Sequence, residues 1–316
     1  MKKFCSVKDV KDLSAIVKMA REIKANPFAN DQLGKHKVIG LLFFNPSLRT
    51  RLSTYKAAKN LGMDVVVMNL NSDGWKLEFE DGTVMNQQSQ EHVREAAAVV
   101  SQYCDIIGVR TFPSLEDREA DYDETVINKF VEYASVPVIS LESATLHPCQ
   151  SLADVITIEE YKKTERPKVV LSWAPHPKAL PQAVSNSFVE WMKETDYELV
   201  VTNPKGFDLA PSIIDGVEVN HNQDEALKGA DFVYTKNWSS YEDYGKIGQG
   251  FDDWTITGKK MALTNNAKFM HCLPVRRNVV VADEVLDSDK SLVLQQAQNR
   301  TYAAQVVLQK MLLGEE

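Results

Sequence analysis

Residues 38–62 read VIGLLFFNPSLRTRLSTYKAAKNLG, an apolar run followed by a polar turn and a helical pattern. The run 38–44 predicts a buried strand, and a helix is expected to begin near Ser47. Four side chains recur there at helical spacing: Leu48, Leu52, Tyr55 and Ala58. A second apolar run, DVVVMNL at 64–70, follows the helix. A strand, a helix and another strand in this order predict a βαβ unit of a parallel sheet.

The same alternation continues through all 316 residues, a length typical of about two domains. The strand candidates are 38–44, 64–70, 105–110, 136–141, 168–174, 197–203, 231–236 and 268–273. Helical patterns separate them, and the final segment from Asn299 onward also has the pattern of a helix. This order predicts an α/β protein with two Rossmann-like three-layer domains, each with a central parallel sheet, bridged by a C-terminal helix.

The composition is that of an ordinary globular protein, with 44% apolar and 25% charged residues. A net charge of −8 argues against nucleic acid or an anionic membrane as partner. No apolar run is long enough to span a bilayer, and residues 1–10 lack the apolar core of a signal peptide. The four cysteines form no CxxC pair, so we expect a cytoplasmic protein without a metal site.

Polar side chains follow the strand candidates at their carboxyl ends, which is where parallel sheets bind ligands. These positions are Ser47–Arg51, Arg110, Glu142, the HPCQ segment 147–150, His176, Lys236 and the CLPVRR segment 272–277. The pattern predicts one crevice that both domains line.

The helix start at Ser47 has the chemistry of a phosphate site. Its first turn offers backbone N–H groups and the positive end of the helix dipole. The hydroxyls of Ser47 and Thr50 and the guanidinium of Arg49 add further donors, which predicts a phosphate cradle. A capped helix with solvated arginines is the alternative. The glycine patterns of dinucleotide and nucleoside triphosphate sites are absent from the sequence.

The stretch HPCQSLAD at 147–154 adds a second candidate. Pro148 favours an extended His147, and Ser151 with Asp154 is expected to form a capping box that starts the next helix. His147 and Gln150 would then lie at a helix entrance, able to donate hydrogen bonds to a substrate carbonyl. A purely structural histidine is the alternative.

Together, SLRT, HPCQSLAD, HCLP and the late NR closely resemble the carbamoyltransferases of the aspartate and ornithine type, in order along the whole chain. The resemblance implies a carbamoyl-phosphate-binding domain at 1–143 and an acceptor-binding domain at 144–297. It implies a C-terminal helix at 298–316 that packs back on the first domain. It also implies a homotrimer with shared active sites, and no cofactor.

The motifs imply which residues bind carbamoyl phosphate: Ser47, Leu48, Arg49, Thr50, Trp75, Arg110, His147, Pro148, Cys149, Gln150, Cys272, Leu273 and Arg300. The SLRT residues would hold the phosphate, and Arg110, His147 and Gln150 the carbamoyl group. Trp75 is expected to reach a neighbouring subunit, with a core aromatic as the alternative.

The expected acceptor substrate follows from one position at which this sequence differs from the ornithine carbamoyltransferases. Ornithine carbamoyltransferases carry an aspartate after the VYT strand and then a Ser-Met-Gly loop, whereas this sequence has Lys236 and no such loop. A lysine facing the α-ammonium of ornithine would cost on the order of a few kcal/mol in a desolvated site. Lys236 fits an acylated α-amine, as in the N-acetylornithine and N-succinylornithine branch. The residues expected to bind the acyl-ornithine are Gln90, Glu142, His176, Lys236, Leu273 and Arg276.

Gln90 bears on which acyl group is bound. In this branch the residue before the EH pair is glutamate in the acetyl enzymes and proline in the succinyl enzymes, and glutamine matches neither. A neutral glutamine does not repel a distal carboxylate, and His176, Lys236 and Arg276 offer positive partners. We therefore favour N-succinyl-L-ornithine in arginine biosynthesis, with N-acetyl-L-ornithine as the alternative. Ornithine, a non-catalytic paralogue that binds carbamoyl phosphate and a dinucleotide-dependent oxidoreductase are the remaining rivals.

The implied chemistry needs neither a metal nor a covalent intermediate. The deprotonated δ-amine would attack the carbamoyl carbon while Thr50, Arg110 and His147 stabilise charge on the carbonyl oxygen. Phosphate would leave and take the amine proton, and most of the acceleration would come from positioning. Cys272 is expected to be a semi-buried thiol rather than a nucleophile.

Overall fold

A computed structural model describes residues 1–315, which divide into two compact units. Unit 1 comprises Met1–Ser114, Glu119–Cys149 and the chain from Arg300 onward. Unit 2 comprises Leu115–Arg118 and Gln150–Asn299.

Unit 1 contains a five-stranded parallel sheet in the order β1-β7-β6-β2-β3. Its strands are β1 (Lys3–Phe4), β2 (Val38–Phe43), β3 (Asp64–Asn69), β6 (Ile106–Arg110) and β7 (Val138–Glu142). All residues of β6 and β7 are buried, as expected for a parallel sheet with both faces covered.

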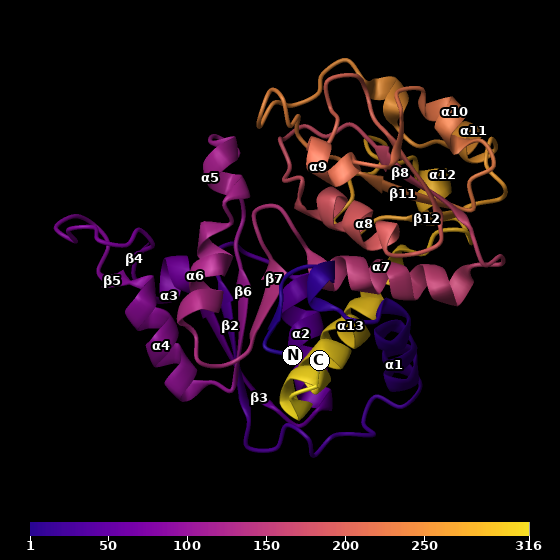
Figure 1. Cartoon of the computed structure of the whole chain (residues 1–316). Coiled ribbons are helices and arrows are strands. Elements are labelled where there is room, and N and C mark those ends of the chain that lie inside the picture. Colours follow the sequence, from indigo (N-terminus) through magenta and orange to yellow (C-terminus); the bar gives the residue numbers. More distant parts are fainter. Residues whose placement is uncertain (316) are drawn as a thin grey trace. The chain divides into compact units, whose positions relative to one another are not determined.

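Helices cover both faces of this sheet. Figure 1 shows α4 and α6 on one face and α1, α2 and α13 on the other. The helices are α1 (Leu13–Ala25), α2 (Arg49–Asn60), α3 (Leu70–Asp73), α4 (Val93–Tyr103), α5 (Arg118–Tyr122), α6 (Thr125–Tyr133), α7 (Pro148–Tyr161) and α13 (Val293–Leu313). The first residue of α5 and parts of α7 and α13 belong to unit 2. Val93 and Ala97 of α4 pack with Ile127 and Phe130 of α6 in one buried cluster, which fixes both helices on the strands.

Between β3 and α4 the chain leaves the sheet in a long excursion (Figure 1). Two short strands, β4 (Leu77–Glu78) and β5 (Glu91–His92), pair in parallel at its base. Asp81 fixes the excursion to α6, because its carboxylate accepts hydrogen bonds from Lys129 Nζ at 2.6 Å and Tyr133 OH at 2.8 Å.

Unit 2 has a second five-stranded parallel sheet, in the order β10-β9-β8-β11-β12. Its strands are β8 (Lys168–Trp173), β9 (Glu198–Thr202), β10 (Glu218–Asn220), β11 (Phe232–Lys236) and β12 (Lys268–Met270). Its helices are α8 (Ala183–Lys193), α9 (Pro211–Ile214), α10 (Gln223–Leu227), α11 (Gly258–Met261) and α12 (Asp283–Leu286). Val170, Val233 and Phe269, from three neighbouring strands, lie in its buried core.

The predicted α/β class and the eight predicted strands are confirmed. The sequence missed the short strands at 3–4, 77–78, 91–92 and 218–220, which are two or three residues long. The expected capping box is wrong, because α7 begins at Pro148 and Ser151 and Asp154 lie inside the helix. Proline is well suited to the first helical position, where its missing N–H is not needed.

The apolar side chains whose spacing indicated α2 are, unexpectedly, mostly exposed in the structure. Leu48 and Leu52 are 66% and 59% exposed, and Tyr55 is exposed as well, whereas Ala58 is buried. Among residues 1–315, no helix combines the length and apolar character needed to cross a membrane.

Candidate active site

The strand order of unit 1 reverses between β2 and β6, since β3 lies on one side of this pair and β7 with β1 on the other. Ligands of open α/β sheets bind at such a reversal, beyond the carboxyl ends of the strands. The register places Phe43 opposite Arg110, and Arg110 opposite Glu142. The start of α2, Arg110 and Glu142 therefore lie at neighbouring strand ends.

Arg110, Glu142 and His147 are in contact. Arg110 Nη2 lies 2.9 Å from Glu142 Oε2, and both side chains are only 8% exposed. His147 Nε2 lies 3.6 Å from the same carboxylate oxygen. Glu142, which the sequence predicts to bind the acyl-ornithine, places its carboxylate beside both Arg110 and His147.

Arg300, from α13, joins this group from the far end of the sequence. Its Nη2 donates a hydrogen bond to Thr50 Oγ1 at 2.5 Å and lies 3.4 Å from His147 Nε2. Because Thr50 Oγ1 accepts from Arg300, its own hydroxyl hydrogen remains available as a donor. Ser47 Oγ accepts a hydrogen bond from Thr50 N at 3.3 Å and so caps the start of α2.

We call this group, Thr50, Arg110, Glu142, His147 and Arg300, the arginine cluster. Its charges are those of a site that binds an anion. Burial lowers the pKa of Arg110; Glu142 opposes this, and the charges of Arg300 and Arg49 lower it further. The charges of Arg49 and Arg300 thus both act on Arg110, and the carboxylate of Glu142 opposes their effect. Donors on two of these arginines, Arg110 Nε and Nη1 and Arg300 Nε, are buried without a hydrogen-bond partner among residues 1–315.

His147 is neutral in this setting. Burial lowers its pKa well below the ordinary 6.5, and the positive charges of Arg300 and Arg110 lower it further. Since Nε2 accepts from Arg300, the single ring proton is assigned to Nδ1. This atom is buried and has no protein partner in the described part of the chain, so it can donate to a ligand.

The remaining residues of the HPCQ motif are buried. Cys149 Sγ contacts the carbonyl of Ser140 at 3.6 Å, and burial raises the pKa of this thiol to about 12, so it stays protonated. Gln150, in the first turn of α7, donates from Nε2 to Asp154 Oδ1 at 2.8 Å. Gln296 Nε2 donates to the same oxygen at 2.7 Å. Asp154 thus holds two glutamine side chains from inside α7, rather than capping this helix as the sequence predicted.

Unit 2 has its own reversal of strand order, between β8 and β11. His176 follows β8, and Lys236 ends β11, where it donates from Nζ to the carbonyl of Asn237 at 3.0 Å. Arg276 Nε donates to His176 Nε2 at 3.2 Å. Burial lowers the pKa of His176, and the charges of Lys236, Arg276 and Lys178 lower it further. The two cations beside this histidine, Lys236 and Arg276, are suited to a carboxylate ligand.

Cys272 and Leu273 follow β12 in unit 2. Cys272 is buried, and Leu273 N donates to His271 Nδ1 at 2.8 Å. The φ of Leu273 is 57°, in the left-handed region that residues with a side chain rarely adopt. Such conformations cost on the order of 1 kcal/mol and are concentrated at functional sites.

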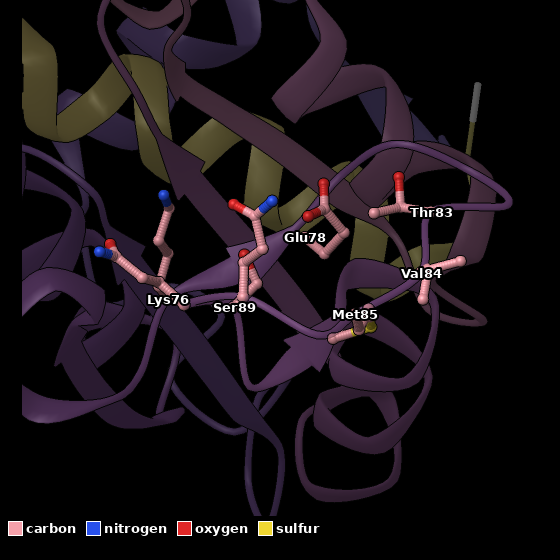
Figure 2. A pocket seen from close by; sticks show the side chains of 8 residues that line it. Lys76, Glu78, Thr83, Val84, Met85 and Ser89 are labelled. Carbon is pink, nitrogen blue, oxygen red and sulfur yellow. The ribbon is translucent and has the colours of Figure 1, made fainter.

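Trp75 and Gln90 lie on the excursion of unit 1, apart from the arginine cluster in the sequence and in the fold. Trp75 is 52% exposed and donates from Nε1 to Glu91 Oε2 at 2.8 Å, so it is not a core aromatic. Gln90 is exposed and donates from its backbone to Lys76 O at 3.0 Å. Figure 2 shows the adjoining cavity of about 390 Å³, whose lining includes Lys76 and Glu78.

The structure thus brings Thr50, Arg110, Glu142, His147 and Arg300 together in unit 1, with Arg49 close enough to act on Arg110. It brings His176, Lys236 and Arg276 together in unit 2. Within residues 1–315, no set of three or more His, Cys, Asp or Glu side chains is grouped to hold a metal ion.

Comparison with known proteins identifies both halves of the chain. Residues 2–160 match the family model described as the aspartate/ornithine carbamoyltransferase, carbamoyl-P binding domain. Residues 181–311 match the model of the Asp/Orn binding domain of the same family.

Individual relatives cover nearly the whole chain. The chain is 52% identical over 318 residues to an N-succinylornithine carbamoyltransferase of Bacteroides thetaiotaomicron, with 100% of both chains covered. It is 36% identical to an N-acetylornithine carbamoyltransferase of Xylella fastidiosa, with 98% of each covered. A solved glutamate-to-proline variant of N-acetyl-L-ornithine transcarbamylase is 35% identical, with a TM-score of 0.94 and 98% and 100% coverage. That variant is complexed with carbamyl phosphate and N-succinyl-L-norvaline.

Proposed function

The chain belongs to the aspartate/ornithine carbamoyltransferase family, and we propose that it transfers the carbamoyl group of carbamoyl phosphate to N-succinyl-L-ornithine. The products are N-succinyl-L-citrulline and phosphate, a step of arginine biosynthesis. The observation that carries the reaction is the convergence of Arg49, Arg110 and Arg300 beside a neutral His147.

Carbamoyl phosphate matches the chemistry of this cluster. Its phosphate is a dianion, and guanidinium groups bind phosphate through paired, charge-assisted hydrogen bonds. Ser47, Leu48, Arg49 and Thr50, at the start of α2, are assigned to the phosphate, because a helix N-terminus adds backbone donors and a favourable dipole. We assign this substrate to the domain 1–143 together with the helix 298–316, and the acceptor to the domain 144–297.

The reaction forms a bond from the δ-nitrogen to the carbamoyl carbon and breaks the bond from that carbon to the phosphate oxygen. Negative charge grows on the carbonyl oxygen during the attack, and buried donors stabilise it most. Arg110, the hydroxyl of Thr50 and Nδ1–H of His147 are assigned this role. The departing phosphate accepts the proton that the amine loses.

Gln150 is assigned an accepting role rather than the donating one expected from the sequence. Its Nε2 is held by Asp154, which leaves Oε1 buried without a donor in residues 1–315. A carbonyl oxygen can accept from the carbamoyl NH2 group and so orient the reacting carbon.

The cationic group of unit 2 supports an acylated acceptor with carboxylates. Lys236 and Arg276, the two cations beside His176, would repel the free α-ammonium of ornithine and attract a succinyl carboxylate. The 52% identity to N-succinylornithine carbamoyltransferases, against 36% to the N-acetylornithine enzymes, points in the same direction. Gln90 adds no charge that would repel the succinyl group. N-acetyl-L-ornithine is the second candidate, because Gln90 is not the proline of the succinyl branch.

We further propose a cytoplasmic homotrimer with shared sites. The exposed apolar side chains of Leu48, at the N-cap of α2, and of Leu52 and Tyr55 on that helix support burial against another copy of the chain. The half-exposed Trp75 on the excursion supports a residue that completes a neighbour's site.

The test is formation of the citrulline product from carbamoyl phosphate with N-succinyl-L-ornithine, N-acetyl-L-ornithine, ornithine or aspartate as acceptor. We expect the highest kcat/KM with N-succinyl-L-ornithine. Gln90→Glu should lower that value about ten- to a hundredfold by charge repulsion and spare the acetyl substrate. The matched control is Gln88→Glu, which adds the same charge two residues earlier. A wild type that prefers the acetyl substrate, or equal losses for both substrates in Gln90→Glu, would contradict the succinyl assignment.

A further inference from the structure

A four-residue loop, Ser143–Leu146, joins two members of the arginine cluster. Glu142 ends β7 immediately before the loop, and His147 immediately follows it. The loop is closed by a backbone hydrogen bond from Ser143 N to Leu146 O at 2.8 Å. Its conformation therefore decides where Glu142 and His147 stand relative to each other.

Glu124 holds this loop from outside the cluster. Its Oε1 accepts hydrogen bonds from Ser143 Oγ at 2.6 Å, Thr145 N at 2.7 Å and Thr145 Oγ1 at 2.5 Å. Its Oε2 accepts from Ala144 N at 3.1 Å. One carboxylate thus satisfies two backbone N–H groups and two hydroxyls of consecutive residues, which is a dense set of charge-assisted hydrogen bonds.

Helix capping does not explain this residue. Glu124 directly precedes α6, yet its side chain makes no hydrogen bond to the first turn of that helix. Its φ is 52°, a left-handed conformation that costs roughly 1 kcal/mol for a residue with a side chain. Burial raises the pKa of Glu124, and the hydrogen bonds from the loop oppose this shift. The hydrogen bonds from this one loop therefore offset both the strained backbone of Glu124 and the partial burial of its charge.

We propose that Glu124 is a positioning residue of the transferase site, fixing through Ser143, Ala144 and Thr145 the placement of Glu142 and His147. The proposal rests on the proposed function, in which His147 and the Glu142-oriented Arg110 act on the carbamoyl group. The hydrogen bonds of Glu124 go to Ser143, Ala144 and Thr145, so its effect passes through the loop. Displacement of reacting groups by about 1 Å is enough to cost about a hundredfold in rate.

The proposal separates the carbamoyl half of the site from the phosphate half. Arg49 and Thr50 belong to α2, which the Glu124 contacts do not reach. Loss of the Glu124 carboxylate should therefore impair catalysis and carbamoyl recognition while phosphate binding persists. A general loss of structure would impair both halves together.

The main variant is Glu124→Gln, which keeps the size but replaces one accepting oxygen by an NH2 group that cannot accept from a backbone N–H. We expect kcat with N-succinyl-L-ornithine to fall about 30- to 300-fold. Calorimetry should give an inorganic phosphate Kd within about threefold of wild type at full stoichiometry, and a preference for carbamoyl phosphate over phosphate about tenfold smaller. Thr145→Val, which removes only the Thr145 hydroxyl, should shift kcat in the same direction by about fivefold.

Asp121→Asn is the matched control, because Asp121 is another buried carboxylate that accepts from Ser114 N and Oγ in a different loop. It should retain wild-type kcat and preference. Wild-type kcat in Glu124→Gln and Thr145→Val would overturn the proposal, as would parallel losses of phosphate and carbamoyl phosphate binding. If Glu124→Gln does not fold, Thr145→Val alone decides. A wild type inactive with every acceptor would refute the proposed function instead.

Discussion

Removing Arg110 should harm anion binding more than the loss of one contact predicts, because Glu142 stays behind. The two side chains lie 2.9 Å apart and are only 8% exposed. At an effective dielectric constant near 20, their attraction is about 6 kcal/mol before desolvation is subtracted. In Arg110→Met the buried carboxylate loses this partner and repels a bound dianion.

The expected magnitude follows from the cost of breaking one partner out of a buried pair, about 3–5 kcal/mol. Binding of phosphonoacetamide, a non-reacting analogue of carbamoyl phosphate, should therefore weaken by roughly 150- to 5,000-fold in Arg110→Met. Glu142→Leu alone should leave binding within about threefold of wild type, or tighten it, because an uncompensated Arg110 favours the anion. The double variant should recover about 2 kcal/mol, or roughly thirtyfold, relative to Arg110→Met.

The assay is a double-mutant cycle by calorimetry without acceptor, so that any effect on acyl-ornithine is excluded. Thermal melts of all four proteins control for folding. Purely additive effects, or a Glu142→Leu protein that binds as poorly as Arg110→Met, would refute the role given to this pair. In that case Glu142 would contact the ligand itself rather than orient Arg110.

Four further outcomes are expected. Arg49→Ala should abolish turnover and weaken carbamoyl phosphate binding by several kcal/mol, measured by calorimetry. Near-normal affinity in a folded variant would contradict the assignment of Arg49 to the phosphate. Subunit exchange between Arg110→Ala and Trp75→Ala proteins should restore partial activity, since some mixed sites carry neither lesion, and inactive mixed trimers would exclude a shared site. Lys236→Ala should raise KM for the acyl-ornithine far more than the Kd of carbamoyl phosphate. His147 stays neutral in the folded chain, whereas the unfolded chain binds a proton there below about pH 6.5, so stability should fall by about 1 kcal/mol between pH 6.5 and 5.5; His147→Gln should lack this loss.

The sequence by itself determined the elements and the positions of the chemistry. Apolar runs alternating with helical patterns are local signals, so the eight longer strands and the α/β class could be predicted. The rule that ligands bind beyond parallel strands then singled out Arg49, Arg110, His147, His176 and Lys236 without any knowledge of strand order. The shortest strands gave too little pattern to detect.

Only the tertiary structure decided which of these side chains meet. The strand order places β6 between β2 and β7, and so joins Arg110 to Glu142 and brings α2 beside them. No local pattern encodes that order, because each crossover could in principle place the next strand at either edge of the strands already paired. Arg300 meets Thr50 across 250 positions of sequence. Glu124 could not be singled out from the sequence, because a carboxylate before a helix resembles a cap until the fold shows that it binds a different loop. Periodicity determines which face of an element is apolar, but long-range packing determines what that face and its neighbours touch.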